Sequence, residues 1–258
     1  MARIHAFEFE DLSWFPKRIR DYGTDFLQFV TNKFDFYKGI APLLSEALNK
    51  TGQNEIIDLA SGGGGGWKSL ARHLKEKNPS LKITLTDYYP NLNAFNNAKE
   101  EDPELYSFVE ESVDARNVPV HLNGFRTQFL SFHHFKHEDA LKILQNAVDS
   151  KAGIGIFEGQ KRDVPHFIKN LLSPISIIIA TPFIRPFKAG RILFTYILPI
   201  VPLFVLWDGV ISVLRTYSVK EMEDLVQKVN GSESYEWKIG LNKTKGITVP
   251  YLIGYPKS

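Results

Sequence analysis

A run of five glycines at positions 62–66 constrains the fold of this chain more than any other feature of its sequence. The apolar, β-branched residues 56–59 before the run predict a buried strand, with Asp58 near its carboxyl end. After the run, apolar residues recur every three or four positions between Trp67 and Leu74, which predicts an amphipathic helix. A strand, a tight turn and a helix form the first half of a βαβ unit, whose bare turn backbone and helix N–H groups bind polar ligands. Flexible linkers lack such flanks, so a linker is disfavoured.

The same alternation of strands and helices continues along the chain. Further apolar runs predict strands at 81–87, 106–115, 125–135 and 153–159. A helix is expected at 138–150 and another at 218–229, and the last two strands, 234–241 and 248–255, are joined by a short polar loop. The pattern predicts an α/β fold: a Rossmann-like doubly wound sheet with an antiparallel C-terminal hairpin, N-terminal helices and a helical apolar insertion.

The chain of 258 residues is long enough for one large α/β domain that carries an insertion. Residues 1–50 predict helices divided near Pro42, which we expect to form a lid packed against the sheet. The core is expected to comprise residues 51–162 and 218–258, with the apolar helical insertion at 163–217.

The composition excludes several classes of function. A formal net charge of +2 without a long basic run gives no electrostatic footprint for a nucleic-acid partner. The absence of cysteine excludes disulfides, thiolate nucleophiles and zinc–thiolate sites, and fits a cytoplasmic protein. The first residues mix acids with aromatics and lack an uninterrupted apolar core, so we do not expect a secretory signal there.

The glycine turn suits two classes of nucleotide cofactor. A dinucleotide site carries G-x-G-x-x-G and an acid about 20 residues further on. Gly62 and Gly64 match the first two positions and Asp87 would serve as the acid, but Trp67 stands at the sixth position. A nicotinamide-dependent oxidoreductase is therefore the less favoured alternative.

The sequence resembles the class I S-adenosylmethionine-dependent methyltransferases in an ordered set of motifs. The stretch 58–64 reads D-L-A-S-G-G-G, Asp87 ends the second predicted strand, and Asp114-Ala115 follow the third. The resemblance implies S-adenosyl-L-methionine as cofactor, with Asp87 accepting hydrogen bonds from the ribose hydroxyls and an acid near 114 for the adenine amino group. The cofactor-binding residues that it implies are Asp58, Ala60, Ser61, Gly62, Gly64, Asp87, Tyr88, Asp114 and Ala115.

One position departs from the family pattern, and each acid has a local alternative. Ala60 stands where the family usually has its first glycine, and its methyl group could crowd the turn. Asp58 could instead hydrogen-bond the glycine turn, Asp87 could cap the next helix, and Asp114 could be an ordinary loop acid. A catalytically silent protein that keeps the fold for binding or membrane association therefore stays open as an alternative.

The N-terminal segment 14–26 is expected to close over the cofactor. Arg20 or Tyr22 would then lie near the cofactor carboxylate, since a helix without a strand partner must dock near the open end of the sheet. The alternative is that Arg20 pairs with Asp21 or Asp25 on a solvated face.

Transfer of an activated sulfonium methyl group requires alignment of a nucleophile and exclusion of water, and it needs no metal. A hydroxyl acceptor would benefit from a base. His133 and His134 follow the fourth predicted strand and are the candidate catalytic residues, expected to face the cleft. The alternative is that they only pack or hydrogen-bond a neighbouring loop.

The insertion is expected to determine the acceptor. Its longest apolar run, 192–207, contains two prolines and is shorter than the ~20 residues needed to span a bilayer. It could roof an apolar acceptor pocket with Phe204 and Trp207 facing the acceptor, or form a homodimer interface. It could also lie on a membrane surface with Lys169, Arg185, Lys188 and Arg191 at the headgroups. These features predict methyl transfer, by O-methylation, to a lipophilic small molecule, by a protein that is cytoplasmic or peripheral at the membrane.

Overall fold

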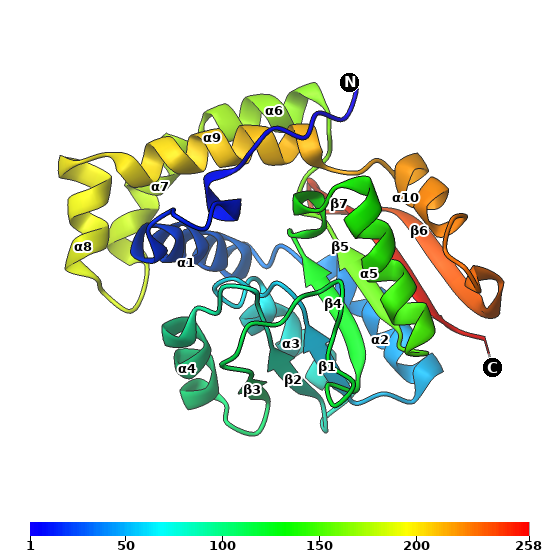
Figure 1. The fold of residues 1–258 in the computed structure, drawn as a ribbon. Helices are drawn as coiled ribbons and strands as arrows, with labels where there is room; N and C mark the ends of the chain where they lie inside the picture. Colours follow the sequence, from blue (N-terminus) through cyan, green and yellow to red (C-terminus); the bar gives the residue numbers. More distant parts are fainter. Residues whose placement is uncertain (258) are drawn as a thin grey trace.

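A central seven-stranded sheet organises the computed structural model, which describes residues 1–257 (Figure 1). The strand order is β3-β2-β1-β4-β5-β7-β6, with β1 to β5 parallel and β7 antiparallel to both β5 and β6. The strands are β1 (Glu55–Asp58), β2 (Lys82–Leu85), β3 (Tyr106–Phe108), β4 (Phe125–Phe129), β5 (Ile154–Phe157), β6 (Tyr235–Thr244) and β7 (Ile247–Pro256). The predicted doubly wound sheet and its antiparallel C-terminal hairpin are confirmed.

Helices cover both faces of this sheet because successive strand residues point to opposite sides. Ile56 packs in one buried cluster with α2 (Ala41–Thr51) and α3 (Trp67–Lys75). Its neighbour Ile57 packs in a second cluster with α5 (His137–Asp149) and α10 (Val219–Val226). Helix α4 (Leu92–Glu101) adds Phe95 to the first cluster.

Two predicted strands are shorter in the structure than the sequence suggests. The third ends at Phe108. The Val109 N–H still donates to the Leu85 carbonyl of β2 at 3.1 Å, but the chain then turns toward Asp87, whose carbonyl accepts the Val113 N–H at 2.9 Å. The fourth ends at Phe129, because Leu130 adopts a left-handed backbone conformation with a φ of 50° that no ladder continues. A short 3-10 turn, η3 (Phe132–His134), follows it.

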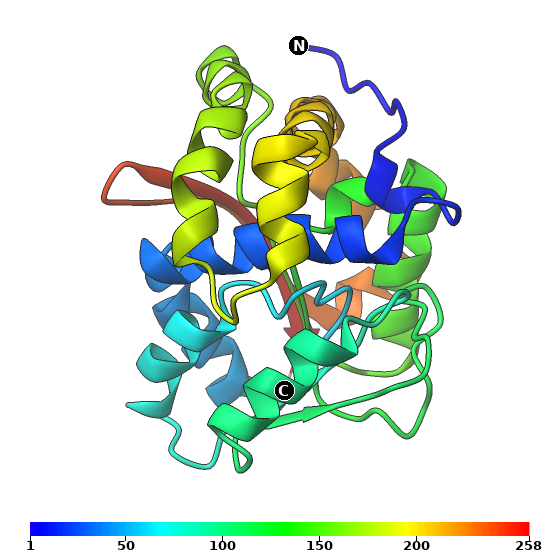
Figure 2. The ribbon, with the colours of Figure 1, turned by 90° about the vertical axis from the view of Figure 1, so that its left-hand side faces the viewer.

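The first residues of the chain form an extended strap and a long helix. Short turns lie at η1 (Phe9–Asp11) and η2 (Lys38–Ile40), and α1 (Lys17–Lys33) runs between them. The strap, defined here as residues 3–12, lies beside the insertion, with the Ile4 N–H donating to the Leu214 carbonyl at 3.1 Å. In Figure 2, α1 crosses between the insertion and the sheet.

The insertion is helical throughout most of its length and lies beside α1 (Figures 1 and 2). Its elements are α6 (Val164–Leu171), α7 (Ser173–Ala180), η4 (Thr181–Phe183), α8 (Ala189–Ile192), η5 (Leu193–Ile197) and α9 (Ile200–Arg215). Outside the insertion, a short turn, η6 (Ser232–Ser234), precedes the C-terminal hairpin. Phe15, Ile19 and Phe26 from the N-terminal region share a third buried cluster with Ile177 and Phe204 of the insertion. The insertion therefore packs mainly on α1 and the strap.

Candidate functional site

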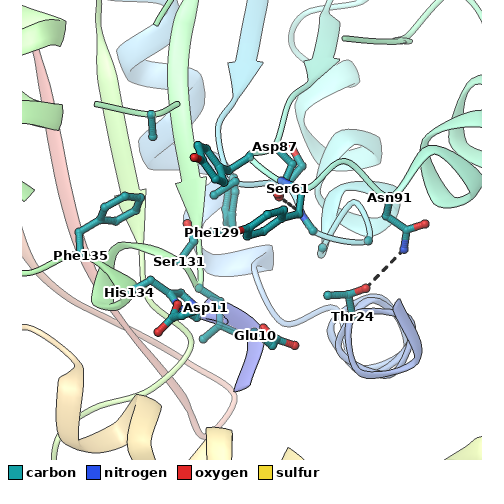
Figure 3. A pocket seen from close by; sticks show the side chains of 18 of the residues that line it. Glu10, Asp11, Thr24, Ser61, Asp87, Asn91, Phe129, Ser131, His134 and Phe135 are labelled. Atoms are coloured by element: carbon teal, nitrogen blue, oxygen red, sulfur yellow. Dashed lines mark hydrogen bonds and ion pairs between the residues drawn. The ribbon is translucent and has the colours of Figure 1, made fainter. Parts of the chain in front are cut away.

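A pocket of about 510 Å³ lies where the chain leaves the carboxyl ends of β1, β2 and β4 (Figure 3). In doubly wound sheets, ligands bind at this edge, where the strand order reverses. The loops after these strands supply one wall and the strap and α1 supply the other, with Glu10, Asp11 and Thr24 among the residues that face the cavity. The volume lies in the usual range for small-molecule sites.

The turn after β1 is tied to the end of β2 by a set of hydrogen bonds. The Gly62 N–H donates to Oδ2 of Asp87 at 2.7 Å, and the Tyr89 N–H donates to Oδ1 of the same carboxylate, also at 2.7 Å. The Ser61 N–H donates to the Thr86 carbonyl at 2.9 Å. Burial raises the pKa of Asp87, and the two N–H donors oppose this rise. Ser61, Gly62, Asp87 and Tyr88, all expected at a cofactor site, line the pocket.

Asp58 lies beneath the turn instead of in the pocket wall. The side chain is 2% exposed and accepts a hydrogen bond from the Thr127 hydroxyl at 2.7 Å. Burial raises its pKa to about 6. The expected direct cofactor contact of Asp58 is therefore not seen in the pocket lining, and the alternative that it supports the turn fits its position.

The glycines make room for the protein's own N-terminal region, at Thr24 of α1 and at Tyr37, as well as for a ligand. A Cβ on Gly63 would lie 3.0 Å from the Thr24 carbonyl oxygen, and one on Gly66 would lie 2.6 Å from the Tyr37 ring. Gly62 and Gly63 line the pocket, whereas Gly64, with a φ of 85°, serves the turn and does not line it.

Ala60 lines the pocket and adopts a φ of 55°, a left-handed conformation that favours glycine. Its methyl group does not prevent the turn. The cost of the departure from the family pattern is local backbone strain.

Asp114 and Ala115, which were expected at the adenine of a cofactor, also line the pocket. The Asp114 carboxylate is engaged by Arg116, whose Nη2 lies 2.7 Å from Oδ2. The hydrogen bonds from Arg116 lower the pKa of Asp114. A ligand beside Asp114 would therefore meet an ion pair and not a free carboxylate.

Of the two α1 residues expected near the cofactor, Arg20 lines the pocket and Tyr22 does not. Arg20 lines the pocket, donates from Nη2 to the Leu12 carbonyl at 2.8 Å, and lies over the Tyr89 ring at 4.5 Å from its centroid. The alternative pairing of Arg20 with Asp21 or Asp25 is not seen among residues 1–257: the guanidinium donates to the Glu10 and Leu12 carbonyls, and Asp25 accepts from Nη1 of Arg191 at 2.6 Å. Tyr22 points away from the pocket into the cluster shared with the insertion, because α1 turns its apolar side to those helices.

The expectation that both histidines face the cleft holds for His134 only. His133 is buried outside the lining, and its Nδ1 lies 2.9 Å from Oε2 of Glu158. His134 lines the pocket, with Nδ1 2.8 Å from Oδ1 of Asp11. Burial alone would lower the pKa of His134, but Glu8 and Asp11 raise it to about 10. The imidazole is therefore protonated at neutral pH and cannot act there as a base.

Sequence reasoning missed the acids that the strap brings to the pocket. Glu10 lines the cavity, and burial together with the charge of Asp208 raises its pKa to about 8. Asp208 on α9 accepts the Phe9 N–H at 2.8 Å and the Glu10 N–H at 3.1 Å, and burial raises its pKa to about 7. The acids alternating with phenylalanine at 7–11 were the available signal.

Glu8, His133 and His134 have the donor types of a metal site, with one ligand atom of each within 4.8 Å of the others. Protein groups already engage this set. Nη1 of Arg215 lies 2.9 Å from Oε1 of Glu8, and Nδ1 of His134 is held by Asp11. The donors fit an internal ion-pair network better than a metal ion.

The insertion contributes none of the residues that line this pocket among residues 1–257. Phe204, expected to face an acceptor, is buried against Phe15 at a centroid distance of 5.2 Å. Trp207 donates its indole N–H to the Phe7 carbonyl at 3.0 Å. The insertion packs behind the strap, and the strap itself forms the roof.

Comparisons with known proteins are informative at the level of structure. No protein-family model matches the sequence, and no curated protein matches it. The methyltransferase domain of bacterial CtHen1-CN is similar, with 14% identity, a TM-score of 0.50, and coverage of 86% of this chain and 100% of that domain.

Two larger methyltransferases also match. An O-methyltransferase family protein from Burkholderia thailandensis is 15% identical with a TM-score of 0.48, over 86% of this chain and 56% of that one. Human N-acetylserotonin methyltransferase, solved with S-adenosylmethionine, is 14% identical with a TM-score of 0.48, over 90% of this chain and 56% of that one. This chain thus spans little more than half the length of these two proteins.

At such low identity a likeness establishes the fold alone, and the domain matched over its full length carries that conclusion. The strand order and the antiparallel last strand agree with it. The chain has the fold of the class I S-adenosylmethionine-dependent methyltransferases.

Proposed function

We propose that this protein transfers a methyl group from S-adenosylmethionine to an oxygen atom of a lipophilic small molecule. The observation that carries the proposal is the pairing of the glycine turn with Asp87 at the wall of the pocket. This pairing joins the two family motifs that are most diagnostic in the sequence at the edge of the sheet where ligands bind.

The residues present fit the cofactor. Each Asp87 oxygen accepts one backbone N–H and keeps a further lone pair, so the carboxylate can also accept from ribose hydroxyls. Bare backbone at Gly62 and Gly63 lets a ligand approach closely. Ala115 and the Asp114–Arg116 pair would border the adenine end.

The chemistry asks little of the protein beyond alignment and the control of one proton. S-adenosylmethionine supplies a methyl group on a positively charged sulfur. Protonated His134 would attract an ionised acceptor oxygen, such as that of a phenol. Glu10, whose pKa is about 8, would accept the acceptor proton in its ionised form, which becomes the major form only above about pH 8.

The cavity also offers apolar surface to the acceptor. Its apolar lining includes Leu27, Phe129, Leu130 and Phe135. An acceptor with an aromatic or aliphatic body and one ionisable hydroxyl matches this mixture of apolar wall and charged groups. The charged groups would hold the hydroxyl, and the apolar wall would bury the body.

Calorimetry of the purified chain with S-adenosylmethionine and, separately, with NADH tests the cofactor. We expect saturable binding of the first and none of the second. Mass spectrometry of reactions with a panel of phenols would then identify a product heavier by one methylene. Binding of NADH alone would instead support the oxidoreductase alternative, and failure to bind either cofactor would overturn the proposal.

A further inference from the structure

The insertion exposes an unusually large apolar surface, which is named the insertion surface below. Most large apolar side chains that are exposed in residues 1–257 lie on it. They are Val164, Ile168, Leu171, Leu172, Ile175, Ile178, Ile179, Phe183, Phe187, Leu193, Tyr196, Ile197, Leu198, Ile200, Leu203 and Trp207. Soluble monomeric proteins rarely expose so many large apolar side chains on neighbouring elements unless the surface binds a partner or a membrane.

Helices α7 and α9 of the insertion each bury some apolar residues and expose others. On α9, Val201 and Phe204 face the core, whereas Leu203 and Trp207 remain exposed. On α7, Ile177 is buried, whereas Ile179 is 64% exposed. These helices therefore carry more apolar side chains than the core of this chain buries.

The charge pattern of the insertion distinguishes between possible occupants. Residues 164–207 contain no aspartate or glutamate, while His166, Lys169, Arg185, Lys188 and Arg191 supply only basic groups. Asp25 of α1 pairs with both Lys188 and Arg191 and offsets one of their two positive charges. Lys169 and Arg185 are exposed and have no carboxylate within ion-pair distance among residues 1–257.

In a two-fold dimer through the insertion surface, the basic side chains of both copies would share an interface to which residues 164–207 bring no acidic partner. The cytoplasmic leaflet of a membrane offers the complementary combination of apolar interior and anionic headgroups. The pattern of an apolar surface with a basic rim is typical of proteins that lie on a bilayer.

The loop between α7 and α8 places exposed apolar side chains directly beside a basic one. Phe183 and Phe187 are 64% and 63% exposed, and Arg185 lies between them in the sequence.

No single helix of residues 1–257 is long and apolar enough to cross a bilayer. Two pairs of helices reach that length and composition only when taken together, and each pair is bent, by 46° and 78°.

We propose that the insertion surface docks on an anionic membrane, with its apolar side chains at the boundary between headgroups and acyl chains and Lys169 and Arg185 at the headgroups. The surface also reaches the strap, because the Phe7 ring lies 5.2 Å from that of Trp207. A membrane would thus lie beside the roof of the pocket. This inference stands on the surface alone and holds whether or not the pocket methylates an acceptor.

Co-sedimentation of the full chain with vesicles tests the proposal. We expect binding to mixed phosphatidylcholine–phosphatidylserine vesicles and weaker binding to phosphatidylcholine alone, with the difference reduced by salt. Ile179→Glu and Leu203→Glu should each weaken binding about tenfold or more, because they place a charge at the apolar boundary. Val120→Glu is the matched control, since Val120 is 96% exposed and lies outside the insertion, and it should bind like the parent.

A charge variant tests the contribution of the basic side chains, and measurements of folding and of oligomeric state serve as controls. Arg185→Gln should reduce the preference for anionic vesicles and leave binding to neutral vesicles unchanged. Thermal unfolding by circular dichroism identifies any variant that has lost its fold, and the other variant then carries the test. Absence of vesicle binding by the parent chain overturns the proposal, as does binding that neither glutamate variant weakens. A dimer in sedimentation equilibrium that Ile179→Glu dissociates, without vesicle binding, would assign the surface to self-association instead.

Discussion

The backbone N–H of Gly62 lies 2.7 Å from Oδ2 of Asp87, so the turn after β1 and the acid after β2 form one unit. The carboxylate is half-buried and desolvation raises its pKa, yet two N–H donors stabilise its charged form. The acid therefore orders the glycine turn and presents its remaining lone pairs to the pocket.

Asp87→Asn should weaken S-adenosylmethionine binding about tenfold to a hundredfold, because the ribose hydroxyls lose a charged acceptor in a partly desolvated site. Calorimetric titration measures the dissociation constant. Glu104→Gln, at an exposed position away from the pocket, is the control and should bind normally. Equal affinity of the Asp87 variant and the parent would contradict the assignment of Asp87.

Ala60→Gly should stabilise the protein by up to about 1 kcal/mol, since a non-glycine residue in the left-handed region costs roughly 1–2 kcal/mol. Ala60 has a φ of 55°. Urea denaturation measures the change. Ala98→Gly in α4 is the comparison and should destabilise by about 1 kcal/mol, as expected for glycine in a helix. Destabilisation by both substitutions would show that Ala60 is not strained.

The strap should loosen as the pH rises from about 6 to about 9. Burial and Asp208 raise the pKa of Glu10 to about 8, so folding favours its protonated form and ionisation destabilises the fold. The pKa of Asp208, raised to about 7, acts in the same direction. Glu8 and Asp11 raise the pKa of His134 to about 10, so its contribution is full below 6.5 and is lost as the pH approaches 10.

Urea denaturation at the two pH values measures this loss of stability. Glu10→Gln cannot ionise and should reduce the loss by about 1–3 kcal/mol. Glu104→Gln, at an exposed site, should leave the loss unchanged. A pH dependence that is the same in the Glu10 variant and the parent would refute the link between Glu10 and the strap.

Phe204→Ala should destabilise the protein by about 3–5 kcal/mol, because it leaves a cavity between α9, Phe15 and Gly23. S-adenosylmethionine affinity of the folded protein should not change, since Phe204 lies outside the pocket lining. Leu203→Ala, at an exposed neighbour, should cost less than about 1 kcal/mol. A Phe204 variant of normal stability with impaired turnover would restore the idea that Phe204 contacts the acceptor.

The strands and the cofactor motifs were predictable from the sequence because their signals are local. Residues 56–59 alternate between the two faces of the sheet, and Asp87 follows the next strand, so their meeting at one edge follows from the parallel topology. The same topology places Ala60, Ser61, Asp114 and Ala115 at the pocket, because they follow parallel strands. Arg20 lines the pocket because α1 covers that edge of the sheet.

Only the tertiary structure decided the roof of the pocket and the protonation of His134. Glu8 and Asp11 meet Arg215 and His134 across more than a hundred residues of chain, and no periodicity within the strap specifies those partners. The pKa of His134 depends on these distant charges, and the separation of Phe204 from the pocket depends on how α9 packs on Phe15. The sequence by itself determined which segments form strands and a ligand-binding turn, whereas long-range packing and buried charge determined which side chains face the ligand and in which charge state.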